Sequence, residues 1–363
     1  MSSCFILVAG SYHKYTPVLS SQETPLSFRA AIASSLSVAL LSGCASVATE
    51  EQPKARTLLP LHSILNTHII DSETGRGISV EALAERWQDV DVVVIGELHG
   101  HNGAHLLQAR MQVALYQHHP SQILSLEQFN VVHQPQLDRY LGGELGEAEM
   151  IEDAEAWDNY KASYRPLVAF AADLGEPVIA ANAPADMVRC VGRQGTSALE
   201  AFPPKMQALL PEDPFYSDPA YRERFFGALG GHGGNASNQL ENRYKAQLLR
   251  DNTMASRIAQ ALKEHPGHQV LHLTGTFHSE YRSGTVAALE ALAPDLQIRV
   301  LSPVVVEQAN APSFDQADLD KGDAIYLLAP LPPEYADPER MRDAIRAQFS
   351  EARDIECPQA TSP

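Results

Sequence analysis

Four side chains that can transfer protons or bind a metal follow short apolar runs in this sequence: Glu97, His99, Glu127 and His278. Glutamate can act as a general base, and histidine can bind a metal or polarise a carbonyl group. Both histidines end a Gly-x-x-His segment, which begins at Gly96 in one case and at Gly275 in the other. One such histidine could simply cap a strand-to-helix turn by hydrogen bonding. Two matched segments favour a shared site instead.

The apolar runs predict the strands that position these side chains. Continuously apolar runs are typical of strands buried on both faces of a parallel sheet. Ligands of such a sheet bind beyond the carboxyl ends of its strands, so we expect the four side chains at one edge. The predicted strands are Val90–Ile95, Ile123–Leu126, Pro177–Ala181, Val270–Thr274, Ile298–Leu301 and Ala324–Leu328. The expected fold class is α/β, with a mostly parallel β-sheet flanked by helices and a smaller helical subdomain inserted over the sheet edge.

Changes of composition along the chain predict its domain organisation. The segments are a leader at 1–43, a lipidated cysteine and tether at 44–58, an α/β domain at 59–332 and a polar tail at 333–363. The tail contains one amphipathic stretch, which predicts a helix around Pro338–Ala352. Two stretches interrupt the alternation of strands and helices and are expected to be helical insertions, at about 142–174 and about 202–250.

The N-terminal region has the layout of a secretory signal. One arginine and a short apolar core precede the segment Leu41–Cys44, and this core is too short to span a membrane. The ending resembles a bacterial lipobox, which implies that Cys44 is lipidated. Ala45 follows it, and no Asp is present there to signal retention in the inner membrane. By resemblance to enterobacterial sorting, we therefore expect the anchor in the outer membrane. Residues 1–26 do not resemble a signal, so we expect translation to start downstream, at Val18 or Leu26.

Composition argues against nucleic-acid binding and leaves open whether two cysteines form a disulfide. The formal net charge is −18 and there is no basic run, which argues against nucleic-acid binding because phosphate neutralisation needs clustered Lys and Arg. Apart from Cys4 and Cys44, the chain has only Cys190 and Cys357, which could pair in an oxidising compartment. No Cys-x-x-Cys-His segment occurs, so covalent c-type haem attachment is excluded.

Five ordered motifs resemble the ChaN-like haem-binding lipoproteins, a family of the wider Tiki/TraB/EreA group with paired Gly-x-x-His motifs. The motifs are Gly96–His99, Leu126–Glu127, Ala180–Pro184, Tyr244–Ala255 and Gly275–His278. The resemblance implies an outer-membrane lipoprotein that faces the periplasm and acts in haem or iron uptake. It also implies a homodimer in which two haems stack face to face between protomers, each iron bound by a tyrosine oxygen. An outer-membrane haem or siderophore receptor would then be a further partner.

Tyr244 is the tyrosine that we expect to bind the haem iron. A phenolate oxygen suits ferric haem, but the pKa of free tyrosine is near 10, so the iron and a nearby cation must favour the phenolate. Tyr244 lies between Arg243 and Lys245. The alternative ligands are Tyr216, Tyr221 and His232. The resemblance implies further haem-binding contacts from His99, His278, Glu97, Glu127, Asn182, Arg243 and Arg250.

A metal-dependent hydrolase is the main alternative, because the wider group includes proteases and macrolide esterases. In this hypothesis Glu97 or Glu127 is the general base, while His99 and His278 bind zinc or another divalent metal. A catalytic zinc site needs three protein ligands and one open position. The chain has neither a His-Glu-x-x-His nor a Gly-x-Ser-x-Gly motif, so the common hydrolase signatures are missing. A third possibility is a periplasmic binding or scaffolding domain. Haem binding is the favoured hypothesis.

Overall fold

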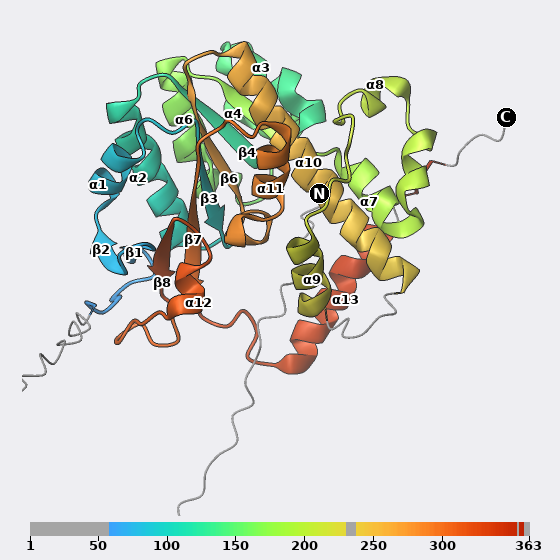
Figure 1. The fold of residues 1–363 in the computed structure, drawn as a ribbon. Helices are drawn as coiled ribbons and strands as arrows, with labels where there is room; N and C mark the ends of the chain where they lie inside the picture. Colours follow the sequence, from blue (N-terminus) through green and yellow to red (C-terminus); the bar gives the residue numbers. More distant parts are fainter. Residues whose placement is uncertain (1–57, 230–236, 354–355, 359–363) are drawn as a thin grey trace, which may run out of the picture. The chain divides into compact units, whose positions relative to one another are not determined.

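The computed structural model describes residues 58–229, 237–353 and 356–358 (Figure 1). The predicted leader, Cys44 and the tether up to residue 57 lie outside the described residues, and so does His232. The described part folds around one sheet with helices on both faces (Figure 1). This confirms the predicted α/β fold class.

The described residues form an eight-stranded sheet in the order β2-β1-β8-β7-β3-β6-β4-β5. The strands from β3 to β8 pair in parallel, whereas β1 pairs antiparallel with β2 and β8. Their bounds are Thr67–Asp71 (β1), Arg76–Ile78 (β2), Val92–Glu97 (β3), Gln122–Asn130 (β4), Val178–Asn182 (β5), Gln269–Gly275 (β6), Ile298–Val305 (β7) and Ala324–Leu328 (β8).

All six predicted strands are present, as β3 to β8. Every residue of β3 and β6 is buried, as expected for strands covered on both faces. The sequence did not predict β1 and β2, which form a hairpin at the edge of the sheet. Their runs are short and mix polar with apolar residues, so they lack the continuous apolar signal of the parallel strands.

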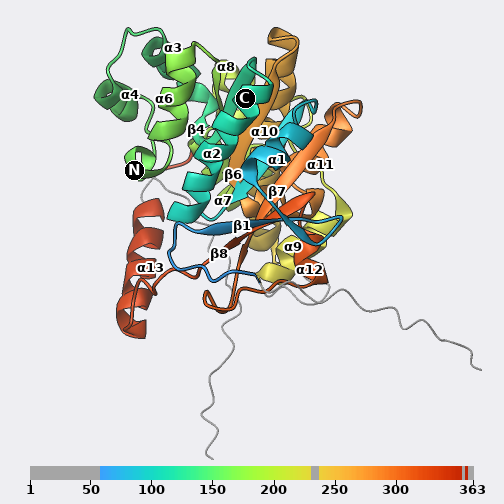
Figure 2. The same ribbon diagram turned by 90° about the vertical axis from the view of Figure 1, so that its left-hand side faces the viewer.

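Helices cover each face of the sheet and form two separate apolar cores. One core packs the sheet against α1 (Val80–Arg86), α2 (Asn102–His118) and α6 (Arg165–Leu174). The other packs it against α10 (Asn238–Glu264) and α11 (Thr285–Leu292). Figure 2 shows α1 and α2 from the side on which they lie over the sheet. The remaining helices are α3 (Gln134–Leu141), α4 (Glu147–Asp153), α5 (Tyr160–Ser163), α7 (Ala185–Gln194), α8 (Pro204–Gln207), α9 (Pro219–Ala228), α12 (Gln316–Leu319) and α13 (Pro338–Arg353).

The insertion expected at 202–250 is joined to the main domain by one long helix. The helix α10 has 27 residues, begins after the N-cap Ser237 and continues beyond residue 250 along the sheet. Its first half packs with α7 and α9, and its second half contributes Ala255 and Ile258 to the core over the sheet. The helical subdomain is therefore held rigidly to the sheet by a continuous backbone (Figure 1).

A disulfide joins Cys190 on α7 to Cys357 in the tail. The two Cα atoms lie 5.6 Å apart, and 167 residues separate the cysteines along the chain. The half-buried Cys357 packs against the apolar cluster of α7 and the following segment. This answers the question that the sequence left open, because the two cysteines do pair. The predicted tail helix is also present, as α13.

Candidate functional site

The carboxyl ends of β3, β6 and β4 bring the four chemically active side chains together. These strands are neighbours, and Glu97 at the end of β3 is in register with Gly275 at the end of β6. Glu127 lies near the end of β4, and His278 follows β6 in a short 3-10 helix, η3 (Thr276–His278). The structure thus assembles at one sheet edge the residues that the sequence placed there.

Glu97 is a buried carboxylate surrounded by hydrogen-bond donors. It accepts bonds from Gln108 Nε2 at 2.5 Å, Gln128 Nε2 at 3.1 Å and the Tyr164 hydroxyl at 2.5 Å. Its Oε1 lies 2.7 Å from His99 Nδ1. Burial alone would raise the pKa of Glu97, but the hydrogen bond and charge of His99 outweigh it and hold the pKa below its usual value. The same contact raises the pKa of His99 despite its burial. Glu97 therefore orients His99 and favours its charged form.

Glu127 is held by the backbone and side chain at the end of β6. Its Oε2 accepts hydrogen bonds from the Thr274 hydroxyl and the Gly275 N–H, both at 2.7 Å. Its Oε1 lies 3.5 Å from His278 Nε2. Burial opposes ionisation, yet the charges of His278 and His99 lower the pKa of Glu127 to about 2. Glu127 is thus an ionised carboxylate between the two histidines.

His278 is oriented by a second buried carboxylate, Asp251 of α10. His278 Nδ1 lies 2.7 Å from Asp251 Oδ1. Asp251 also accepts hydrogen bonds from the Tyr221 hydroxyl at 2.8 Å and the Thr285 hydroxyl at 2.9 Å. Burial lowers the pKa of His278, but the charges of Asp251 and Glu127 raise it above its usual value. Both histidines therefore use Nδ1 for a buried carboxylate.

Gly275 permits the close approach of His99 to the end of β6. A Cβ atom at this position would lie 3.0 Å from His99 Nε2 and 3.7 Å from Glu127 Oε2. Trp157 packs edge-on against the His99 ring, with 4.9 Å between the ring centroids. The second glycine of the paired motifs thus has a steric role: it leaves room for the imidazole of the first motif.

Asn182 and Arg250 lie at the same edge, and Arg243 lies earlier on the helix that carries Arg250. Asn182 ends β5, and its Oδ1 accepts a hydrogen bond from Arg250 Nη1 at 3.3 Å. The charge of Arg250 acts to lower the pKa of both His99 and His278, against the stronger effect of the nearby carboxylates. Arg243 is exposed on α10. Its expected contact with haem stays a prediction.

The tyrosines expected as iron ligands differ strongly in exposure. Tyr244 is 1% exposed, its hydroxyl lies 2.6 Å from Ser217 Oγ, and its ring packs against Phe225. Burial raises the pKa of Tyr244, which is opposite to the shift expected from its flanking cations. Tyr221 is also buried and donates to Asp251. Tyr216 is 40% exposed, and only this ring of the three is open to a ligand in the described conformation.

The strand-end residues do not form a metal site. In the part of the chain that the structure describes, no group of three or more His, Cys, Asp or Glu side chains is arranged to hold a metal ion. Both glutamates that the hydrolase hypothesis offered as a base or ligand already accept hydrogen bonds: Glu97 from side chains of Gln108, Gln128 and Tyr164, and Glu127 from Thr274 and the Gly275 N–H. The geometry therefore does not favour the hydrolase alternative.

Sequence reasoning did not assign several polar side chains to this site. They are Gln108, Gln128, Tyr164 and Asp251. Tyr221 was named only as an alternative iron ligand, whereas in the structure it donates to Asp251. Gln128 could have been found, because it follows Glu127 inside a buried run and a buried amide needs a partner. The others come from helices or, in the case of Tyr164, from the turn between α5 and α6, and the sequence does not reveal which face of these segments meets the end of the sheet.

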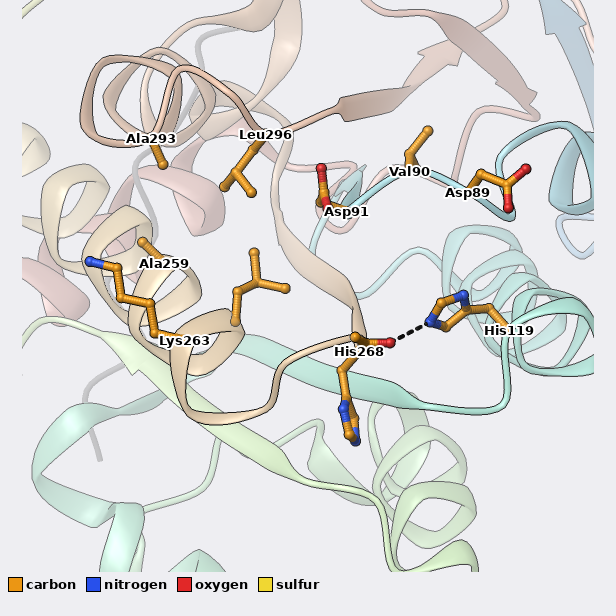
Figure 3. A pocket seen from close by; sticks show the side chains of 11 residues that line it. Asp89, Val90, Asp91, His119, Ala259, Lys263, His268, Ala293 and Leu296 are labelled. Carbon is orange, nitrogen blue, oxygen red and sulfur yellow. Dashed lines mark hydrogen bonds between the residues drawn. The ribbon is translucent and has the colours of Figure 1, made fainter.

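A groove of about 360 Å³ lies at the opposite edge of the sheet, where β3 and β6 begin (Figure 3). Two of its polar side chains have partners: His119 Nε2 lies 2.9 Å from Gly267 O, and Asp91 Oδ2 accepts from the Gln297 N–H at 2.7 Å. The lining residues are Asp89, Val90, Asp91, His119, Ala259, Leu262, Lys263, Gly267, His268, Ala293 and Leu296. None of the predicted site residues lines this groove.

Several solved structures are similar to this chain. ChaN of Campylobacter jejuni, whose structure shows cofacial haem binding, is 19% identical with a TM-score of 0.54, over 73% of this chain and 97% of that one. The type III effector HopBA1 is 12% identical (TM-score 0.43; 74% and 100% covered). A mutant of the erythromycin esterase EreC is 13% identical (TM-score 0.39; 62% and 72% covered).

No curated protein sequence matches the chain. The model of the family described as "Haem-binding uptake, Tiki superfamily, ChaN" matches residues 83–289, a span that includes both Gly-x-x-His segments. This span is more than half of the sequence. The chain therefore belongs to the ChaN family of haem-binding uptake proteins in the Tiki superfamily.

Proposed function

We propose that this protein binds ferric haem for haem or iron uptake at the bacterial outer membrane. Membership of the ChaN family supports haem as the ligand. The structural observation that carries the proposal is an exposed phenol on the 202–250 insertion. Tyr216 is 40% exposed, and Asn252 of α10 holds its backbone carbonyl with a hydrogen bond of 3.0 Å. An open side chain on a fixed backbone suits a ligand that approaches from solvent.

We propose Tyr216 as the axial ligand, ahead of Tyr244. Bound ferric haem would supply an iron(III) centre that a hard phenolate oxygen stabilises. The phenol oxygen must be accessible to serve this role. Tyr244 would have to leave Ser217 and the aromatic cluster that buries it, whereas Tyr216 needs no such rearrangement. Its exposed position therefore supports Tyr216.

We further propose that haem binds between two copies of the chain. Large apolar side chains of the insertion are exposed to solvent: Leu209, Tyr216 and Leu229. A flat porphyrin gains most when both of its faces are removed from water, which a second protomer can provide. An outer-membrane haem or siderophore receptor remains the proposed source of the haem.

The proposed location rests on the lipobox at Cys44 and on the disulfide. Disulfides persist in oxidising compartments such as the bacterial periplasm, so the bond between Cys190 and Cys357 supports a periplasm-facing protein. Among the described residues, no helix is both long and apolar enough to cross a membrane. Mass spectrometry of the mature N-terminus tests the anchor: an acylated Cys44 is expected, and an unmodified peptide running through Cys44 would refute it.

Ferric-haem titrations of phenylalanine variants test the ligand. Tyr216→Phe is expected to lose the high-spin tyrosinate spectrum and to weaken binding by about tenfold or more. Tyr244→Phe should keep both the spectrum and the affinity. Tyr335→Phe is the matched control, since this tyrosine is exposed in the tail. Loss of the spectrum in Tyr244→Phe but not in Tyr216→Phe would refute the assignment.

A further inference from the structure

Four large apolar side chains are exposed where β1 begins and where β7 and β8 end. They are Leu59, Leu65, Val305 and Leu331. The three strands are neighbours in the sheet (Figure 1), and both Thr67, which begins β1, and Val305, which ends β7, are in register with Leu328 of β8. The carbonyl oxygen of Leu59 lies 2.7 Å from His68 Nε2, which holds Leu59 beside β1. We call these four side chains the apolar edge.

The segments that carry the apolar edge contain no charged residue. No Asp, Glu, Lys or Arg occurs in residues 58–66, 300–306 or 324–333, although these four types make up 20% of the chain. Exposed leucines elsewhere have charged neighbours: Leu174 follows Asp173, and Leu292 lies between Glu290 and Asp295. A single exposed leucine is ordinary on a protein surface, but a charge-free group of exposed apolar side chains marks an interaction surface.

The position of Cys44 in the chain indicates the partner of this surface. The described residues begin at Leu58, directly before the apolar edge, and Cys44 lies 14 residues earlier. Fourteen residues span at most about 50 Å. A lipid anchor at Cys44 therefore keeps the apolar edge within that distance of the bilayer. For a protein tied to a bilayer in this way, the nearest apolar partner is the lipid itself.

We propose that the apolar edge lies against the phospholipid surface and inserts its four side chains at the level of the headgroups. Apolar side chains of interfacial sites enter about 5–10 Å into this layer. Insertion removes apolar area from water, and in these segments no charged group has to lose its hydration. This inference rests on the proposed lipid anchor at Cys44. It adds an orientation, because the carboxyl ends of the parallel strands then point towards the membrane.

A tryptophan placed in the apolar edge reports contact with lipid. The processed, anchored protein is reconstituted into vesicles of phosphatidylethanolamine and phosphatidylcholine with brominated acyl chains, which quench tryptophan on contact, and the emission of the wild type is subtracted. Leu331→Trp is expected to lose more than about half of its added emission, because an inserted side chain reaches the acyl boundary. Leu292→Trp is the matched control and should keep its emission. Leu292 is 54% exposed and precedes Ala293, which lines the groove at the opposite edge of the sheet.

Two pairs of polar substitutions, each combined with Leu331→Trp, keep the test specific. Leu59→Gln with Leu65→Gln should reduce the quenching at least about twofold, because less apolar area is left to insert. Leu174→Gln with Leu209→Gln changes two exposed leucines elsewhere and should leave it unchanged. Equal quenching of Leu331→Trp and Leu292→Trp, or an unquenched Leu331→Trp in protein that stays with the vesicles, would overturn the docking alone. Protein that does not stay with the vesicles would overturn the proposed anchor, and the docking with it.

Discussion

Glu97 and His99 show how two residues of one motif depend on each other. Glu97 is 1% exposed and has four close polar neighbours, and His99 is one of them. A buried carboxylate is stable only when donors replace the lost water. The motif thus supplies both the imidazole of His99 and the carboxylate of Glu97, which orients this imidazole and favours its protonated form.

Glu97→Gln is expected to lower the pKa of His99, because the variant lacks the negative charge that now raises it. NMR titration of the imidazole measures this shift. Glu144→Gln, at an exposed glutamate, is the control and should leave the pKa of His99 unchanged. Glu97→Ala should also lower the free energy of unfolding by roughly 3 kcal/mol, since it leaves buried donors without a partner. An unchanged pKa of His99 in Glu97→Gln would contradict this account of the pair.

The buried His272 of β6 is expected to make the folded protein less stable in acid. Burial lowers its pKa from 6.5 to about 4. Between these values the unfolded chain binds a proton that the folded chain does not. The contribution of His272 to stability is therefore present above pH 6.5 and is lost as pH falls towards 4.

His272→Gln should flatten this part of the pH profile. The expected difference between wild type and variant across the window is on the order of 3 kcal/mol. Urea unfolding at several pH values between 6.5 and 4 measures it. The contributions of Glu127, whose pKa is about 2, and of the raised His99 and His278 fall mostly outside this window. Parallel profiles for the two proteins would refute the role of His272.

At the scale of elements, the sequence predicted the strands that have continuous apolar runs and the shared edge at which the glycine-containing motifs meet. The six parallel strands and the meeting of His99, Glu127 and His278 at one edge followed from the runs and the paired motifs. The hairpin of β1 and β2 was missed, because a short edge hairpin needs no continuous apolar run. The pairing of Glu97 with Tyr164 was missed too, since it depends on how α6 and the segment before it pack against the sheet.

The long helix α10 explains why the insertion and the site form one unit. Tyr244 packs in the insertion, while Asp251, two turns later on the same helix, orients His278. A ligand that contacts the insertion is therefore connected to the strand ends through a rigid element. The sequence motif from Tyr244 to Ala255 lies on the part of α10 that connects the insertion to the strand ends.

Because the disulfide joins the tail to α7, we expect it to stabilise the folded protein. Cys357→Ser should lower the free energy of unfolding by about 2–4 kcal/mol, because the bond restricts a long loop of the unfolded chain. Urea unfolding of the oxidised proteins measures the loss. Under reducing conditions the wild type and the variant should have nearly equal stability, and a persistent difference would mean that Cys357 acts through packing instead.

At the scale of the whole molecule, three features bear on the proposed function: a sheet edge with oriented histidines, an insertion with an exposed tyrosine, and a leader that we propose is cleaved before a lipidated Cys44. The ChaN family membership supports haem as the ligand that connects them. If haem binds between two protomers, addition of ferric haem should double the sedimenting mass, and Tyr216→Phe should abolish this change. A monomer that remains a monomer when saturated with haem would refute the proposed interface.

The measurement that tests the central claim most directly is an equilibrium titration of the wild-type protein with ferric haem, followed by absorbance. We expect a saturable Soret band with a high-spin, tyrosinate-type spectrum and a stoichiometry of one haem per chain. A linear, non-saturating response, equal to that of haem with an unrelated acidic protein, would contradict haem binding as the function of this chain.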